Sequence, residues 1–208
     1  MIVLTYVYRD SEGTKQMADS VKRLSYELAP VRTTESPVDI NRSLYECYKR
    51  AQGGHDTFIY SDAADTYFQK AVNVPDDRII YSTEKNCFPN IKLTDQFPPE
   101  TMWRFLNGGG YCGSLKLIVE FFERYGMKDI VMNGQEQAQL AYLKAKADGL
   151  PIELDTHCNI FQSIAFEAEG EFTFKKGLLY NKHTKTTPSI IHGNGTTSMK
   201  HIYNAGKA

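Results

Sequence analysis

Two aspartates follow a short apolar run and have the chemistry to bind a metal ion. The run covers residues 57–60, a pattern typical of a buried strand, and Asp62 and Asp65 come just after it. Carboxylates leaving the end of a strand can hold a divalent cation, whose hard charge prefers oxygen ligands. An isolated Asp-x-x-Asp is also common in helix caps and turns, so the motif alone leaves both interpretations open.

A histidine near the end of the sequence stands in a similar position. His192 follows the short predicted strand 189–191, which ends in two isoleucines, and precedes the glycine-containing stretch 193–195. Ligands of open α/β sheets bind beyond the carboxyl ends of the strands, and a neutral imidazole beside two carboxylates suits Mn²⁺, Zn²⁺ or Fe²⁺. The stretch Asn-Gly-Gly-Gly at residues 107–110 allows either a tight loop or exposed amide groups for a phosphate or a sugar.

The elements that must position these side chains alternate between strand and helix. Strands are predicted at residues 1–7, 57–60, 78–82, 160–162 and 189–191, and helices at residues 17–28, 40–51, 117–122 and 135–147. A hairpin is expected over residues 171–180, turning at residues 175–177. This order predicts one α/β domain over residues 1–208, with a mostly parallel sheet covered by helices on both faces.

The composition excludes several classes of protein. Of the 208 residues, 41% are hydrophobic, which is enough for one sizeable core and excludes a disordered chain. Lys plus Arg number 24 and Asp plus Glu 25, so the chain lacks the basic excess of proteins that grip long nucleic acids. No apolar run approaches the roughly 20 residues of a membrane-spanning helix, so no membrane partner is expected. The four cysteines lack a CxxC spacing, which favours a reduced, cytoplasmic setting.

Five stretches of the sequence match one family in order. They are residues 58–65 (FIYSDAAD), 81–89 (YSTEKNCFP), 104–113 (RFLNGGGYCG), 154–162 (LDTHCNIFQ) and 188–195 (PSIIHGNG). On these stretches the chain resembles the glycosyltransferase domain of the procollagen lysyl hydroxylase (PLOD) family. The resemblance implies a GT-A-type α/β fold, a nucleotide-sugar donor, and Mn²⁺ as the metal ion, with Mg²⁺ as the alternative.

The resemblance also implies the role of particular residues. Asp62, Asp65 and His192 match the metal ligands, and Mn²⁺ held by them would bridge the two phosphates of the donor. Residues expected to border the donor are Thr5 and Tyr6 at the nucleoside, Arg42 at the phosphates, Asn107 and Gly108 at the sugar, and Gly193, Asn194 and Gly195 at the diphosphate. A family lysine after this stretch is Ser198 here, and Lys200 or Lys207 would take its place.

Two departures from the family pattern affect the expected chemistry. Ala64 stands where the family has a tyrosine, so a ring that could lie against the nucleotide base is missing. The family's run of aspartates before a glutamine appears here as residues 133–137, Asn-Gly-Gln-Glu-Gln. In this segment Glu136 retains a carboxylate and Gln137 matches the glutamine, which makes these two the predicted catalytic residues facing the sugar or the acceptor.

The leading hypothesis is a metal-dependent glycosyltransferase that moves a hexose from a UDP-sugar to a hydroxyl group. A hydroxylysine-like side chain, a hydroxylated base in phage DNA and a glycan all remain open as acceptors. DNA would need a basic face, for which the hairpin region offers Lys175, Lys176, Lys182, His183 and Lys185. The sequence contains no hydroxylase half and no secretion signal, which favours a viral or bacterial enzyme. A catalytically inactive nucleotide-sugar-binding relative is the alternative.

Overall fold

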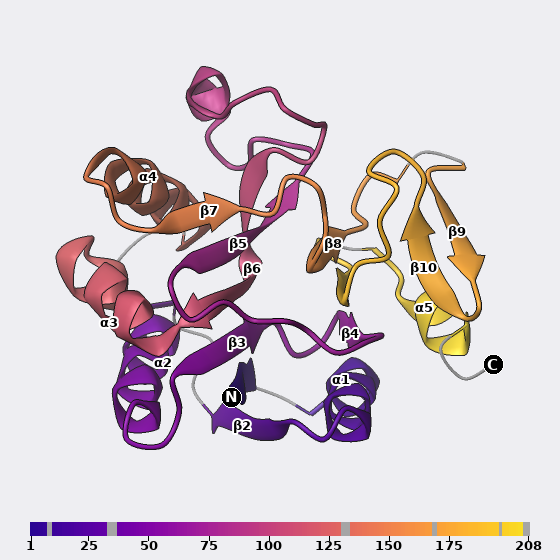
Figure 1. The fold of residues 1–208 in the computed structure, drawn as a ribbon, viewed down its shortest axis with the longest axis horizontal. Helices are drawn as coiled ribbons and strands as arrows, with labels where there is room; N and C mark the ends of the chain where they lie inside the picture. The colour runs from indigo at the N-terminus through magenta and orange to yellow at the C-terminus, as the bar shows by residue number, and fades with distance from the viewer. Residues whose placement is uncertain (8–9, 33–36, 130–133, 168–169, 196, 206–208) are drawn as a thin grey trace.

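A mainly parallel, six-stranded sheet forms the centre of the molecule (Figure 1). The computed structural model describes residues 1–7, 10–32, 37–129, 134–167, 170–195 and 197–205. In spatial order, the strands are β2 (Glu27–Arg32), β1 (Ile2–Val7), β3 (Thr57–Ser61), β6 (Phe105–Ser114), β5 (Ile79–Glu84) and β7 (Ile152–Leu154). The pairs β1–β2, β1–β3 and β5–β7 are parallel, whereas β6 runs antiparallel to β3 and β5.

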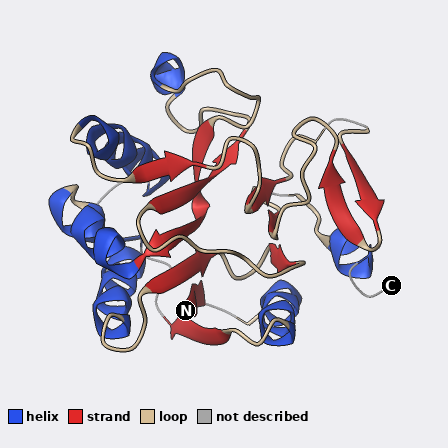
Figure 2. Ribbon diagram, viewed as in Figure 1, coloured by secondary structure: helices blue, strands red, loops and turns tan. Residues whose placement is uncertain are grey.

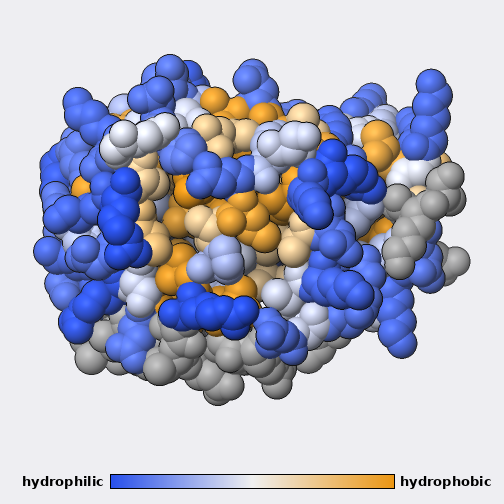
Figure 3. Space-filling view, turned by 90° about the horizontal axis from the view of Figure 1, so that it is seen from below, coloured by the Kyte–Doolittle hydropathy of each residue, from blue (hydrophilic) through white to orange (hydrophobic). Residues whose placement is uncertain are grey.

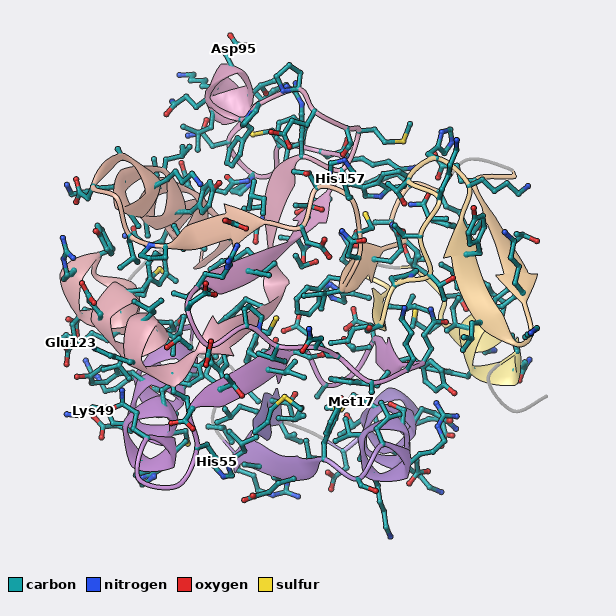
Figure 4. All side chains as sticks on the ribbon, viewed as in Figure 1. Met17, Lys49, His55, Asp95, Glu123 and His157 are labelled. Carbon is teal, nitrogen blue, oxygen red and sulfur yellow. The ribbon has the colours of Figure 1, made fainter. Side chains whose placement is uncertain are left out.

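Helices cover both faces of this sheet, as the sequence predicts (Figure 2). On one face lies α1 (Glu12–Arg23), and on the other lie α2 (Pro37–Ala51), α3 (Leu115–Arg124), the short η2 (Met127–Asp129) and α4 (Gly134–Ala147). Successive side chains of a strand point to opposite faces, so Val3 packs in the cluster with α1 and Leu4 in the cluster with α2 to α4. Met17 is fully buried on the inner side of α1 (Figure 4).

A second layer of short strands lies beside the central sheet. It contains β4 (Thr66–Phe68), β11 (Ile190–His192) and β8 (Phe161–Ser163), with β11 between the other two. The predicted hairpin is present as β9 (Phe172–Lys175) and β10 (Leu178–Asn181). The last helix, α5 (Lys200–Ala205), packs with the hairpin through Ile202 and Leu179, and these elements lie together at one end of the molecule (Figure 1).

The first helix begins and ends earlier along the chain than its apolar spacing predicts. It begins at the cap Ser11, whose side chain accepts a hydrogen bond from the backbone of Thr14, and it ends at Arg23. Ser25 then adopts a left-handed φ of 59°, which turns the chain into β2. Leu28, predicted to be helical, therefore lies in a strand, where Pro30 is tolerated because β2 is at the edge of the sheet.

The glycine run, for which a tight loop was one of two expectations, lies inside β6. The pairing of β5 with β6 jumps from Tyr81 opposite Tyr111 to Ser82 opposite Asn107. Residues 108–110 therefore form a bulge with no partner in β5, and a bulge of this kind re-aims neighbouring side chains.

Seen from the side of β2, apolar residues occupy the middle of the face and hydrophilic residues surround them (Figure 3).

Cys47, Cys87, Cys112 and Cys158 are all free thiols. Among the described residues, the structure contains no helix with the length and apolar character needed to cross a membrane. The short helix η1 (Ile91–Gln96) lies on the excursion between β5 and β6.

Candidate metal and donor site

The three predicted metal ligands meet at one point. Asp62 and Asp65 follow β3, and His192 ends β11. Nε2 of His192 lies 3.5 Å from Oδ2 of Asp62 and 3.5 Å from Oδ1 of Asp65. One ligand atom from each residue falls within 4.8 Å of the others. Two carboxylates and an imidazole at this spacing can converge on one divalent cation.

Strand pairing explains how residues so distant in sequence come together. The aspartates lie on the connection from β3 to β4, and β4 pairs with β11 so that His192 stands opposite Thr66. The backbone N–H of Gly193 donates to the carbonyl of Asp65 at 2.8 Å, and the N–H of Asp62 donates to the carbonyl of Gly109 at 3.0 Å. The backbone of both aspartates is thus held by main-chain hydrogen bonds to the strands that carry His192 and Gly109.

Gly109 in the β6 bulge provides the space in which these side chains meet. A Cβ at this position would lie 2.2 Å from Cε1 of His192 and 2.7 Å from Oδ2 of Asp62. Any side chain at position 109 would therefore push both groups out of place. Gly109 is needed because only a residue without a side chain allows this close approach. Its backbone conformation is not the reason, because its φ lies outside the left-handed region.

The surroundings of His192 orient its ring for metal binding. Oδ1 of Asn107 lies 3.2 Å from Nδ1, so that Nδ1–H can donate to the amide and leave the lone pair of Nε2 facing the aspartates. Burial opposes a charged His192, but the carboxylates of Asp65 and Asp62 outweigh burial and raise the imidazole pKa. Burial also raises the pKa of Asp62 to about 6. Because metal ligands must be deprotonated, binding of a divalent cation would compete with protonation of these groups.

A third acidic residue, Glu84, lines a cavity together with Asp62 and His192 and is missing from the residues predicted from the sequence. Its carboxylate accepts hydrogen bonds from the side-chain amides of Asn107 at 3.2 Å, Gln135 at 3.2 Å and Asn194 at 3.1 Å. Burial raises the pKa of Glu84 to about 7. The sequence does contain a signal for Glu84, because this residue closely follows the predicted strand 78–82, as the aspartates follow the predicted strand 57–60.

Asp62, Glu84 and His192 line a cavity of about 560 Å³, a size typical of small-molecule sites. Its described lining residues are Asp62, Glu84, Asn86, Phe88, Asn107, Gly109, Gln135, Ala165, Phe166, His192, Asn194, Gly195 and Thr197. Asn194, predicted at the diphosphate, has its side chain tied to Glu84 and to Ser163. The N–H of Gly193 is already bonded to Asp65, whereas Gly195 borders the cavity directly.

Two smaller hollows border Asp62 on its other sides, and Tyr6 lines both. One, of about 280 Å³, also includes Gly108 and Tyr60, and the other, of about 140 Å³, includes Ala64. Thr5, the second residue predicted at the nucleoside, is fully buried in the sheet and lines neither hollow.

Two cationic residues predicted near the phosphates lie elsewhere. Arg42 is exposed, forms an ion pair with Asp129 at 3.8 Å, and lines a different hollow beside β2. Lys200 is the exposed first residue of α5 and lines none of the three spaces around Asp62, and Lys207 lies outside the described residues.

At the start of α4, Gln135 faces the site, whereas the sequence suggests Glu136 and Gln137. Glu136 accepts a hydrogen bond from the side chain of Asn90 at 2.8 Å, and neither Glu136 nor Gln137 lines the cavity. Gln135 lines it, donates to Glu84 and accepts from the backbone N–H of Gly108 at 2.7 Å. A shift of two residues along a helix changes the direction of a side chain by more than half a turn, which explains the difference.

Comparison with known proteins identifies the family. A family profile described as "PLOD GT domain" matches residues 53–205, which include the aspartates, Glu84 and His192. The chain belongs to the PLOD GT domain family. The family and the GT-A-type fold predicted from the sequence motifs are thereby confirmed.

Relatives of this PLOD GT domain include larger animal proteins and a viral one. Procollagen-lysine,2-oxoglutarate 5-dioxygenase 1 of Gallus gallus is 30% identical over 235 residues, covering 98% of this chain and 31% of that protein. Multifunctional procollagen lysine hydroxylase and glycosyltransferase LH3 of Homo sapiens is 30% identical over 135 residues, 61% of this chain and 18% of that protein. Protein R699 of Acanthamoeba polyphaga mimivirus is 28% identical over 122 residues, 58% of this chain and 25% of that protein. The chain thus spans about a third or less of each relative.

One solved structure has the same fold across the whole PLOD GT domain. It is a glycosyltransferase involved in the glycosylation of the major capsid of PBCV-1, with a TM-score of 0.55 and 11% sequence identity. The similarity covers 99% of this chain and 98% of that one. At this identity the match concerns the fold alone.

Proposed function

We propose that the protein is a metal-dependent glycosyltransferase that moves a hexose from a UDP-sugar to a hydroxyl group. The observation that carries the proposal is the meeting of Asp62, Asp65 and His192, with ligand atoms within 4.8 Å, at the edge of a cavity of about 560 Å³. Membership of the PLOD GT domain family supports the transferase class. Mn²⁺, or Mg²⁺ in its place, would be held by these three side chains and would offset the charge on the departing diphosphate.

Other residues of the chain would bind the nucleoside and handle the proton. Tyr6 lines both hollows beside Asp62 and would contact the nucleoside. The acceptor oxygen forms a bond to the anomeric carbon, and the bond from that carbon to the diphosphate breaks with its electron pair leaving on the diphosphate. The hydroxyl proton passes to the carboxylate of Glu84, whose pKa of about 7, raised by burial, suits a general base near neutral pH.

Calorimetry of UDP binding, with and without Mn²⁺, tests the donor half of this proposal. The wild-type protein should release heat with UDP only when the metal is present. Asp65→Ala and His192→Ala should each abolish that heat while the circular dichroism spectrum stays that of the folded protein. Absence of metal-dependent heat for any nucleotide diphosphate would contradict the proposal.

A non-catalytic nucleotide-sugar-binding protein is the second candidate, and one observation favours it. The helix start where the family has aspartates offers Gly134 and Gln135, and the Glu136 carboxylate is bonded to Asn90 away from the cavity. A mass-tagged UDP-sugar separates the two functions. Transfer, or slow hydrolysis of the donor that Glu84→Gln abolishes, supports an enzyme, whereas tight binding of intact donor supports the alternative.

The biological setting is also part of the proposal. The mimivirus relative supports a viral source, and the four free thiols suit a reducing compartment such as host cytoplasm. Hydroxylysine, a hydroxylated DNA base and a glycan are the acceptor classes that the family and this setting allow.

A further inference from the structure

The tyrosine two positions before the first predicted metal ligand is hydrogen-bonded to that ligand. Side chains two residues apart along a strand point to the same face of the sheet, and Tyr60, in β3, and Asp62, directly after β3, are related in this way. The Tyr60 hydroxyl donates a hydrogen bond of 2.9 Å to Oδ1 of Asp62. A phenol, with its usual pKa of about 10, is protonated at neutral pH and can donate to a carboxylate.

The other oxygen of the same carboxylate faces the metal ligands. Oδ2 of Asp62 lies 3.5 Å from Nε2 of His192, and it is also the atom that a Cβ at Gly109 would approach to 2.7 Å. The two oxygens of Asp62 therefore have separate surroundings, since the phenol holds Oδ1 and the imidazole lies beside Oδ2. Hydrogen bonds to a ligating carboxylate orient it toward its metal ion.

Packing on both sides fixes the ring of Tyr60 in place. The residue is only 4% exposed, and its ring stacks on that of Tyr111 in β6, with the ring centres 4.6 Å apart and the planes at 28°. On the other flank of β3, the ring of Tyr6 in β1 lies parallel to it within 15°, at 6.5 Å. Tyr111 in turn stacks on Tyr81 of β5 at 4.6 Å. Rings from four adjacent strands thus form a row, and Tyr60 lies within it.

We propose that Tyr60 is a positioning residue of the metal site, whose hydroxyl holds Oδ1 of Asp62 so that the carboxylate binds the cation through Oδ2 alone. This inference rests on the metal site of the proposed function and adds to it a residue that acts through Asp62. A carboxylate that offers one oxygen suits small octahedral cations such as Mn²⁺ and Mg²⁺, whereas the larger Ca²⁺ takes more oxygen ligands and often binds both oxygens of a carboxylate. The Tyr60 hydroxyl thereby favours Mn²⁺ over Ca²⁺.

Titration of the full chain with Mn²⁺, with and without UDP, tests the proposal when the free ion is followed by electron paramagnetic resonance. Tyr60→Phe keeps the ring and removes only the hydroxyl, and it should weaken Mn²⁺ binding about tenfold to a hundredfold, the usual effect of removing a partner of a metal ligand. The affinity for Ca²⁺, measured by displacement of Mn²⁺, should fall less, because the freed carboxylate can bind the larger ion through both oxygens. A merely structural role for the hydroxyl would weaken the binding of both ions equally.

Tyr81→Phe is the matched control. It removes one hydroxyl from the same row of rings, and that hydroxyl has no hydrogen-bond partner in the part of the chain that the structure describes. The affinities of this variant for Mn²⁺ and Ca²⁺ should equal those of wild type, and circular dichroism in EDTA shows whether both variants are folded. A crystal structure of wild type with Mn²⁺ is a second measurement that needs no variant, and in it Asp62 should contact the ion through Oδ2 alone.

The outcomes separate this inference from the proposed function. A loss of Mn²⁺ affinity in Tyr60→Phe with a smaller loss for Ca²⁺ supports the inference even if no sugar is transferred, in which case the transferase proposal alone is lost. Equal Mn²⁺ affinity in wild type and Tyr60→Phe, the same loss for both ions, or contact of both Asp62 oxygens with Mn²⁺ in the crystal would overturn the inference and leave the proposed function standing. A wild-type protein that binds no Mn²⁺, with or without UDP, would overturn both.

Discussion

At the scale of single residues, the metal site requires that residue 109 has no side chain. A Cβ here would lie 2.2 Å from the His192 ring and 2.7 Å from Asp62, so Gly109→Ala should displace both ligands. We expect the Mn²⁺-dependent heat of UDP binding to disappear in this variant. Gly54→Ala is the control, because no atom lies within 4 Å of the added Cβ, and its calorimetric trace should equal that of wild type. Normal metal-dependent binding by Gly109→Ala would show that the three side chains do not form the site.

Glu84 gives a second prediction at this scale, in the pH dependence of stability. Burial raises its pKa from 4.5 to about 7 in the folded protein, so the folded state holds the proton more tightly than the unfolded state does. Its contribution to the free energy of unfolding is therefore greatest below pH 4.5 and falls by about 3 kcal/mol as the pH rises through 7. Glu84→Gln removes this dependence. Urea unfolding in EDTA from pH 4 to pH 8 should show wild type losing stability relative to the variant, and parallel curves would contradict the assignment.

At the scale of elements, the start of α1 supports the loop that carries the aspartates. An added Cβ at Gly13 would lie 1.7 Å from the carbonyl oxygen of Ala64. Helix propensity alone predicts that Gly→Ala stabilises a helix by up to about 1 kcal/mol, but this contact is with backbone that cannot give way, so the steric effect wins. Gly13→Ala should lower the melting temperature. Gly134→Ala, at the open start of α4, should leave it unchanged or raise it, and equal shifts in the two variants would argue against the contact.

The elements also show what the sequence can predict and what it cannot. Apolar runs placed β3 and β11 correctly, and acidic or imidazole groups just after those runs identified Asp62, Asp65 and His192, because strand ends in an α/β sheet converge. The glycine run could not be assigned to a bulged strand, since bulges depend on the register of a partner strand that is distant in sequence.

The direction in which a side chain points was the other property that the sequence could not predict. Gln135 lines the cavity and Gln137 does not, because two residues along α4 turn the side chain by about 200°, and sequence spacing alone does not say which face of the helix meets the site. Arg42 was placed near the phosphates by its position in the sequence alone, whereas its direction is set by the packing of α2 beside β2. Glu84 was passed over because a single acidic residue at a strand end is common, and its three amide partners come from β6, α4 and the segment after β11.

At the scale of the whole molecule, a largely buried ion pair joins the central sheet to the hairpin end. Lys85, directly after β5, binds the carboxylate of Glu171, directly before β9, and its ammonium lies 5.1 Å from the centre of the Trp103 ring. The cavity lies between these two parts of the chain, since β5 supplies Glu84 and the segment after β8 supplies Phe166. The ion pair therefore holds together the two parts of the chain that carry Glu84 and Phe166 on the two sides of the cavity.

Removing one member of this pair should destabilise the whole molecule. Lys85→Met removes the ammonium that pairs with the buried Glu171 carboxylate, and loss of one member of a buried ion pair costs about 3–5 kcal/mol of unfolding free energy. The double variant Lys85→Met with Glu171→Leu should recover much of that loss, because no charge is then left buried. Arg124→Ala, which breaks the exposed pair with Glu120 on α3, is the control and should leave the urea midpoint unchanged. If Lys85→Met unfolds at the wild-type midpoint, or the double variant is the less stable of the two, the pair does not hold the two parts together.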